Sequence, residues 1–126
     1  AVLQKPYAIV GAPLFAADSD EQGQLLLSSQ QRQFINLRRG VPGKLQPPEK
    51  NLQLEVSSAE LAMADQAMAC AVVGSPDSVE RAIRSLLQRT QADELIFASH
   101  IYDHQARLRS YQIASEVRQL MGSART

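Results

Sequence analysis

Residues 93–111 read DELIFASHIYDHQARLRSY, and this stretch indicates the fold class more clearly than any other part of the chain. It begins with four consecutive apolar residues, 95–98, which are typical of a parallel strand buried on both faces. Polar side chains follow at once: Ser99, His100, Tyr102, Asp103 and His104. Because functional groups gather at the carboxyl ends of strands in α/β proteins, the stretch predicts a site as well as a core.

Upstream, strand and helix signals alternate. Residues 7–16 (YAIVGAPLFA) predict a strand with a local irregularity, because Gly11 and Pro13 interrupt it. Asp18, with Glu21 three residues later, predicts a capping box that starts a helix ending before Gly40.

The middle of the chain predicts a loop between helices. Residues 40–51 (GVPGKLQPPEKN) hold three prolines and two glycines, so we expect a flexible lid-like loop over 40–56. Residues 57–68 predict a short helix capped by Ser57 or Ser58, and 69–73 a brief extended apolar run. Ser75 before Pro76 predicts the start of the next helix, and a last helix is expected from about residue 104 to 121.

This order predicts an α/β fold with two parallel strands joined by a right-handed crossover. We interpret residues 1–126 as one partial domain, because a (β/α)₈ TIM barrel typically needs about 250 residues and this chain matches its final part. The chain begins with Ala1 and not Met, so a processed or truncated chain is expected, although removal of an initiator Met would look the same.

Composition disfavours several classes of partner. Thirteen basic and thirteen acidic residues give a net charge of zero, so no field favours nucleic acid or an anionic membrane.

The single cysteine, Cys70, cannot form an internal disulfide and is expected to be a small buried hydrophobe. With no leader peptide and no spanning apolar run in view, we expect an intracellular, cytoplasmic protein.

Four stretches carry a resemblance to a known family: residues 6–22 (PYAIVGAPLFAADSDEQ), 35–45 (INLRRGVPGKL), 73–79 (VGSPDSV) and 93–111. Together they resemble the C-terminal part of the bacterial luciferase-like flavin-dependent monooxygenases, over nearly the whole chain. The phrase SHIYDHQARLRSY is similar to the end of the last strand in one subgroup of bacterial oxidoreductases. VGSPDSV alone is weak, because any helix can begin with Ser-Pro-Asp.

The resemblance implies that this chain supplies strands seven and eight of a TIM barrel, with their helices and a lid-like insertion. The intact enzyme would use reduced flavin, FMN or a deazaflavin, and O₂ to oxygenate a small organic substrate. The fragment alone would be inactive and without bound flavin, and its uncovered barrel surfaces would favour self-association or a homo-oligomer. The alternative is a stand-alone non-catalytic module for flavin binding or dimerisation.

Site residues follow from the same resemblance. Ser99, His100 and Tyr102 would shape the flavin pocket, with His100 as a weak candidate for proton transfer, and Arg39 and Lys44 could close over an anionic cofactor. Simpler roles stay open: Tyr102 packing under the last helix, and Arg39 and Lys44 as solvated charges.

Two other chemistries are disfavoured by the residues themselves. Neighbours on a strand point to opposite faces, so Ser99 and His100 make a poor nucleophile and base. The spacing of His100 and His104 would join two metal ligands only on one continuous helix, so we expect no metal. Asp103 is expected either to line the pocket or to cap the last helix.

Overall fold

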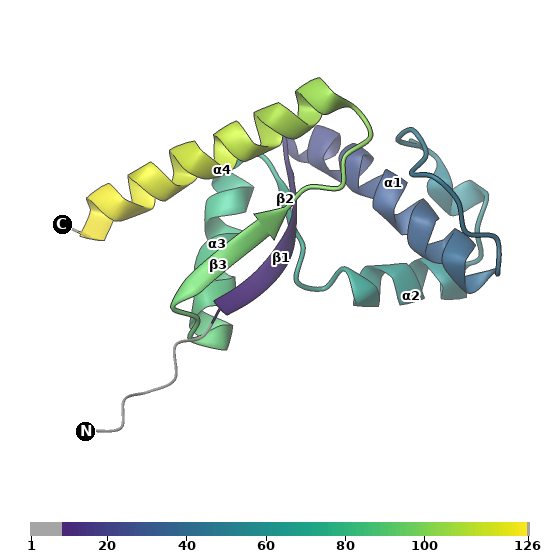
Figure 1. Ribbon diagram of the computed structural model, residues 1–126, viewed down its shortest axis with the longest axis horizontal. Helices are drawn as coiled ribbons and strands as arrows, with labels where there is room; N and C mark the ends of the chain where they lie inside the picture. Colours follow the sequence, from purple (N-terminus) through teal and green to yellow (C-terminus); the bar gives the residue numbers. More distant parts are fainter. Residues whose placement is uncertain (1–8, 126) are drawn as a thin grey trace.

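The computed structural model describes residues 9–125, with side chains described for residues 9–121 (Figure 1). The elements in this range are β1 (Ile9–Ala16), α1 (Asp20–Arg38), the 3₁₀ helix η1 (Leu52–Leu54), α2 (Ser58–Ala67), β2 (Val72–Gly74), α3 (Pro76–Thr90), β3 (Glu94–Ala98) and α4 (His104–Arg125). The predicted order is confirmed with one added strand. Residues 7 and 8 of the first predicted strand lie outside the described range.

The three strands form a parallel sheet in the order β2-β1-β3. Leu14 of β1 lies opposite Val72 of β2, and Ala12 lies opposite Phe97 of β3. The predicted α/β class and the parallel pairing of the two longer strands are therefore confirmed. The prediction of only two strands is wrong, because the run at residues 69–73 contributes to β2, which at three residues is too short for a periodic pattern to reveal.

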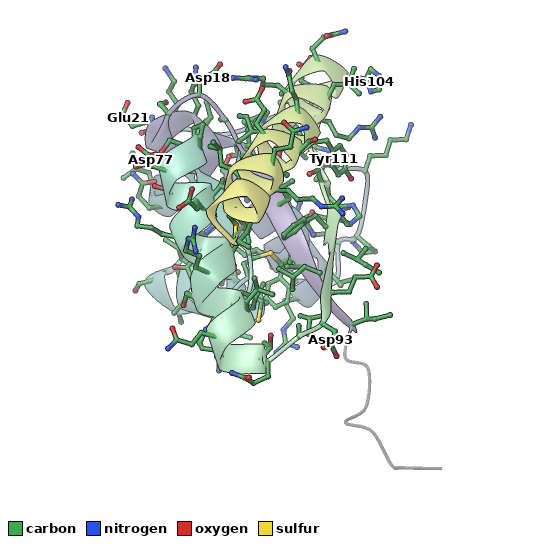
Figure 2. All side chains as sticks on the ribbon, turned by 90° about the vertical axis from the view of Figure 1, so that its left-hand side faces the viewer. Asp18, Glu21, Asp77, Asp93, His104 and Tyr111 are labelled. Atoms are coloured by element: carbon green, nitrogen blue, oxygen red, sulfur yellow. The ribbon has the colours of Figure 1, made fainter. Side chains whose placement is uncertain are left out.

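Helices α3 and α4 cover one face of the sheet (Figure 2). Successive side chains on a strand point to opposite faces, so Ala12, Leu14 and Ala16 of β1 point together into this layer, where they are buried. They pack against Val79, Ile83 and Leu86 from α3 and Ile113, Val117 and Met121 from α4. This cluster is the main core.

The opposite face is covered only in part. Near the carboxyl end of β1, Phe15 is fully buried against Leu27 of α1 and Ile101. The remaining part includes Ile9, Gly11, Ile96 and Ala98, which are exposed, and we call these four residues the bare face; the exposed Glu94 and the half-buried Pro13 point to the same side.

The bare face corrects one prediction. Residues 95–98 were expected to be buried on both faces, but Ile96 is 55% exposed and Ile9, on the neighbouring strand, is 54% exposed. Gly11 lies opposite Ile96 in the register, so both strands present the same open side. The apolar run is typical of a strand covered on both faces, but no described residue covers the face of β3 that carries Ile96.

Helix caps were predicted with one error. Ser75 caps α3 ahead of Pro76, and Ser57 forms a reciprocal capping box with Glu60 at the start of α2. At α1 the cap is Ser19, whose side chain accepts from the backbone N–H of Gln22, so the prediction of Asp18 is wrong by one residue. Asp18 instead accepts two hydrogen bonds from Arg109 of α4, at 3.0 and 2.7 Å.

The connection after α1 contains neither helix nor strand until η1 begins at Leu52. It leaves the helix through Gly40, whose φ of +81° lies in the left-handed region that glycine adopts readily. Cys70, expected to be buried, is exposed, because it lies in the turn between α2 and β2. Among the described helices, none is long and apolar enough to cross a membrane.

Candidate functional site

The carboxyl ends of the three strands lie at one edge of the sheet, because all three run parallel. The segments that follow them are polar: residues 17–19 after β1, 75–77 after β2 and 99–103 after β3. Figure 2 shows Asp18, Asp77 and His104 at this end of the molecule, while Asp93, which precedes β3, lies at the opposite end. The predicted site residues that follow β3 therefore lie where α/β proteins commonly bind ligands.

Asp20 links the start of α1 to the start of α3. Its Oδ1 atom accepts hydrogen bonds from the backbone N–H of Ser75, at 2.8 Å, and from the hydroxyl of Ser78, at 2.6 Å. The bond from the Ser75 backbone is the largest cause that lowers the pKa of Asp20, followed by that from Ser78. The carboxylate thus lies beside the N-terminus of α3, a position that in other proteins can bind a phosphate.

Ser99 is held inside the fold. Its side chain is buried, and its hydroxyl donates to the carbonyl oxygen of Leu14 at 2.9 Å. Its backbone N–H donates to the hydroxyl of Tyr111 in α4 at 3.0 Å. These bonds fasten the end of β3 to β1 and α4, and they turn the Ser99 hydroxyl away from solvent.

His100 and Tyr102 are both exposed, whereas Ile101 between them is buried beside Phe15. Tyr102 is 55% exposed, so it does not pack under α4. Burial of Ile101 anchors the segment, and the imidazole of His100 and the phenol of Tyr102 are exposed to solvent at this edge of the sheet. Of the three residues predicted to shape a pocket here, His100 and Tyr102 are accessible and Ser99 is not.

Asp103 and His104 are engaged with α4. Asp103 accepts from the backbone N–H of Ala106 at 2.9 Å, the geometry of a helix cap, and His104 Nδ1 lies 2.6 Å from a guanidinium nitrogen of Arg107. Among the hydrogen bonds of the described residues, none joins Ser99, His100 and Asp103. In the part of the chain that the structure describes, no three or more His, Cys, Asp and Glu side chains form a group that could hold a metal ion.

Arg39 and Lys44 lie away from the strand ends. They follow the C-terminus of α1, and a 19-residue helix is about 28 Å long at 1.5 Å per residue. Arg39 forms a bidentate pair with Glu60 of α2, at 2.6 and 2.8 Å, while Lys44 is exposed. The structure therefore does not bring Arg39 or Lys44 together with His100 and Tyr102.

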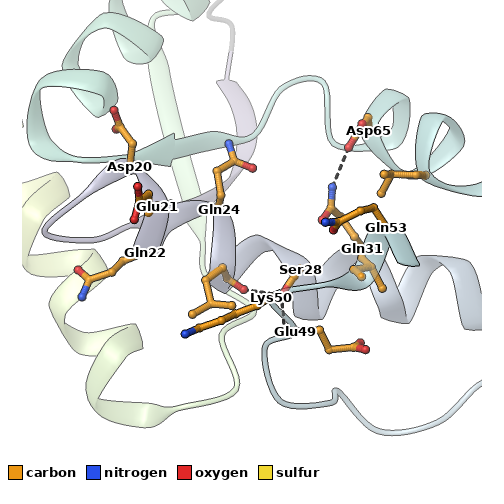
Figure 3. A pocket seen from close by; sticks show the side chains of 13 residues that line it. Asp20, Glu21, Gln22, Gln24, Ser28, Gln31, Glu49, Lys50, Gln53 and Asp65 are labelled. Carbon is orange, nitrogen blue, oxygen red and sulfur yellow. Dashed lines mark hydrogen bonds between the residues drawn. The ribbon is translucent and has the colours of Figure 1, made fainter. Parts of the chain in front are cut away.

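A groove of about 910 Å³, not predicted from the sequence, lies between α1, α2 and the loop before η1 (Figure 3). Gln31 donates to Asp65 across one side of it at 2.7 Å. Its polar lining includes Glu21, Gln24, Ser28, Lys50 and Gln53. A polar stripe at positions 21, 24, 28 and 31 of α1 is the signal that could have revealed this face.

Comparison with known proteins gives relatives for nearly the whole chain. It is 40% identical over 117 residues to "Luciferase-like monooxygenase" of Escherichia coli (strain K12), which covers 93% of this chain and 35% of that protein. It is 36% identical over 116 residues to "Uncharacterized protein YvbT" of Bacillus subtilis, with 92% of this chain and 34% of that protein covered. No protein-family model matches.

A solved structure agrees with these relatives. The crystal structure of apo-MsnO8 matches with a TM-score of 0.68 and 25% identity, over 91% of this chain and 35% of that one. The chain therefore spans about a third of the length of the proteins it matches. The resemblance to the luciferase-like monooxygenases is confirmed, and the coverage is consistent with a fragment of that family.

Proposed function

We propose that this chain, a relative of the luciferase-like monooxygenases, is the C-terminal part of a flavin-dependent oxidoreductase. The observation that carries the proposal is the unequal coverage, 93% of this chain against 35% of the E. coli relative. In the intact enzyme, reduced flavin and O₂ would oxygenate a small organic substrate. The flavin supplies the oxygen chemistry when bound, and the protein supplies binding, orientation and exclusion of water.

The residues present fit one part of a flavin site. His100 and Tyr102 are accessible at the carboxyl edge of the sheet and could contact a ring or a substrate there. The Asp20 carboxylate already lies at the start of α3, where it accepts from the N–H of Ser75 and the hydroxyl of Ser78, so its negative charge disfavours a phosphate there. We therefore assign ring contacts to this chain and the phosphate contacts to residues outside it.

The proposed setting is a (β/α)₈ barrel, to which the chain contributes parallel strands at the closing seam. In support, α3 and α4 cover one face as an outer layer would, and the bare face offers apolar residues to a barrel interior. The packing of α1 against Phe15 seals only the carboxyl half of that face. Residues 40–56 are the candidate lid in this setting.

The second candidate is a stand-alone module without catalytic activity, which binds flavin or forms a dimer. The exposure of Ile9 and Ile96 favours it, because apolar residues on an open sheet are commonly covered by a partner. In either case we expect the isolated chain to self-associate through the bare face.

Two measurements separate these candidates. A reading frame that encodes a chain about three times as long supports the fragment, whereas a frame and an intact mass that both correspond to 13.8 kDa support the module.

In the longer protein, His100→Ala and Tyr102→Ala should each weaken FMN binding in an absorbance titration. The control is Gln119→Ala, an exposed residue on α4, and equal affinities in all three variants would contradict the assigned ring contacts.

A further inference from the structure

Tyr111, on α4 (Figure 2), is bonded to the segment that carries His100 and Tyr102. Its hydroxyl accepts a hydrogen bond of 3.0 Å from the backbone N–H of Ser99, twelve positions earlier in the chain. The hydroxyl of Ser99 donates in turn to the carbonyl of Leu14 on β1, at 2.9 Å. Ser99 is therefore fixed to the helix through its backbone and to the neighbouring strand through its side chain.

These two bonds lie where the pairing of β1 with β3 ends. The last pair of residues in the register is Pro13 with Ala98, and proline has no N–H with which to continue the ladder. Ser99 comes next and is only 7% exposed, so its N–H has little access to water and needs an acceptor within the protein. The hydroxyl of Tyr111 supplies that acceptor from a different element of the fold.

Beyond Ser99 the segment alternates between residues that are held and residues that are exposed. Ile101 is buried, and Asp103 caps α4. His100 and Tyr102 lie between these anchors and are exposed. The places of the imidazole and the phenol are therefore set by what holds residues 99, 101 and 103.

The hydroxyl of Tyr111, and not its ring, makes the connection to this segment. Tyr111 is 41% exposed and belongs to neither apolar cluster of the described core, whereas Ile113 and Val117 of the same helix are fully buried. Tyr111→Phe would keep the ring and remove the acceptor of the Ser99 N–H. The variant thus separates this bond from the packing of α4.

We propose that Tyr111 is a positioning residue of the candidate flavin site, which acts through Ser99 on His100 and Tyr102. Its effect on flavin rests on the proposed function, whereas its effect on the backbone rests on the bond to Ser99 alone. Without the hydroxyl, the end of β3 loses its attachment to α4, and the two exposed side chains are held less closely at the edge of the sheet.

Tyr111→Phe tests the proposal in the protein encoded by the complete reading frame. Hydrogen exchange at the Ser99 amide should accelerate roughly tenfold, because the amide loses its acceptor. In an absorbance titration, FMN should bind about three- to tenfold more weakly. Gln112→Ala, at the exposed next residue of α4, is the matched control and should change neither readout. Exchange in α3 should stay at the wild-type rate, which shows that the variant is folded.

A double-mutant cycle separates positioning from a merely structural role. In a His100→Ala background and in a Tyr102→Ala background, Tyr111→Phe should weaken FMN binding by a smaller factor than in the wild type, because one of the side chains through which it acts is gone. A factor that is undiminished in both backgrounds would overturn the positioning role.

Two further results would each count against the proposal, and they are distinguishable. If the wild-type protein binds FMN and Tyr111→Phe binds it equally well, or if exchange at Ser99 is unchanged, the positioning role fails and the proposed function stands. If the wild-type protein binds no FMN, the proposed function fails, and the role of Tyr111 in a flavin site fails with it.

Discussion

The hydroxyl of Ser110 in α4 accepts a hydrogen bond of 2.8 Å from the backbone N–H of Ala16, the last residue of β1. Both residues are fully buried. A helix that lies far along the chain thus completes the hydrogen bonding of the first strand, at the edge where the candidate site residues gather. Replacing Ser110 by Ala would leave a buried N–H without an acceptor.

Ser110→Ala is therefore expected to lower the free energy of unfolding by about 1–3 kcal/mol. Urea denaturation of both proteins at one protein concentration measures this loss. Ser115→Ala, at an exposed serine of the same helix, should change stability by less than about 0.5 kcal/mol. Equal stabilities of the two variants would show that the bond contributes nothing.

Gly74→Ala is expected to be more damaging. Gly74 has a φ of +126°, and an added Cβ would lie 2.5 Å from Asp20 Oδ1 and 2.8 Å from the Cβ of Ser78. Backbone strain of about 1–3 kcal/mol adds to these overlaps, so we expect a loss of at least about 2 kcal/mol in urea denaturation. Gly43→Ala, where nothing lies within 4 Å of the new Cβ, is the control. A wild-type midpoint for Gly74→Ala would contradict the described geometry.

Glu60 is expected to titrate far below its usual range. Its bonds to Arg39, and secondarily to the backbone of Ser57, lower its pKa from 4.5 to about 2. Because the folded pKa is depressed, the stabilisation is fully present above pH 4.5 and is lost as the pH falls toward 2. An NMR titration of the Glu60 carboxyl measures this, and Arg39→Gln should move the midpoint upward. A wild-type midpoint near 4.5 would rule out the pairing.

Self-association is expected to depend on the bare face. Ile96→Lys places a charge on the exposed face of β3, which lies at the end of the strand order β2-β1-β3, and should shift the 126-residue chain toward monomer in sedimentation velocity. Leu54→Lys, at a leucine that is 78% exposed on η1, tests whether any added charge has this effect. A wild-type chain that stays monomeric at high concentration would overturn the expectation.

Local signals in the sequence predicted much of this fold. Ser75 before Pro76, and Ser57 with Glu60, mark helix starts because a cap depends on residues within one turn. The error at Asp18 arises because its role depends on a contact that is distant in the sequence. Asp18 and Ser19 are both good capping residues, and what separates them is the pairing of Asp18 with Arg109, 91 positions away.

The candidate site was predicted in part, for a similar reason. His100 and Tyr102 are exposed at the strand end, but the Ser99 hydroxyl is taken by the Leu14 carbonyl, 85 positions earlier. The apolar run of β3 resembles a fully covered strand, because a sequence records which residues prefer burial and not which neighbours are present to bury them. The groove beside Gln31 and Asp65 was missed since its walls come from separate segments.

If this chain belongs to a longer flavin enzyme, the intact protein binds FMN, and an absorbance titration measures that binding. The protein encoded by the complete reading frame and the 126-residue chain are titrated in parallel. We predict a saturable change in the flavin bands for the longer protein and none for the 126-residue chain. A longer protein that leaves the FMN spectrum unchanged would contradict the proposed flavin enzyme, and a saturable change with the 126-residue chain alone would favour the stand-alone module.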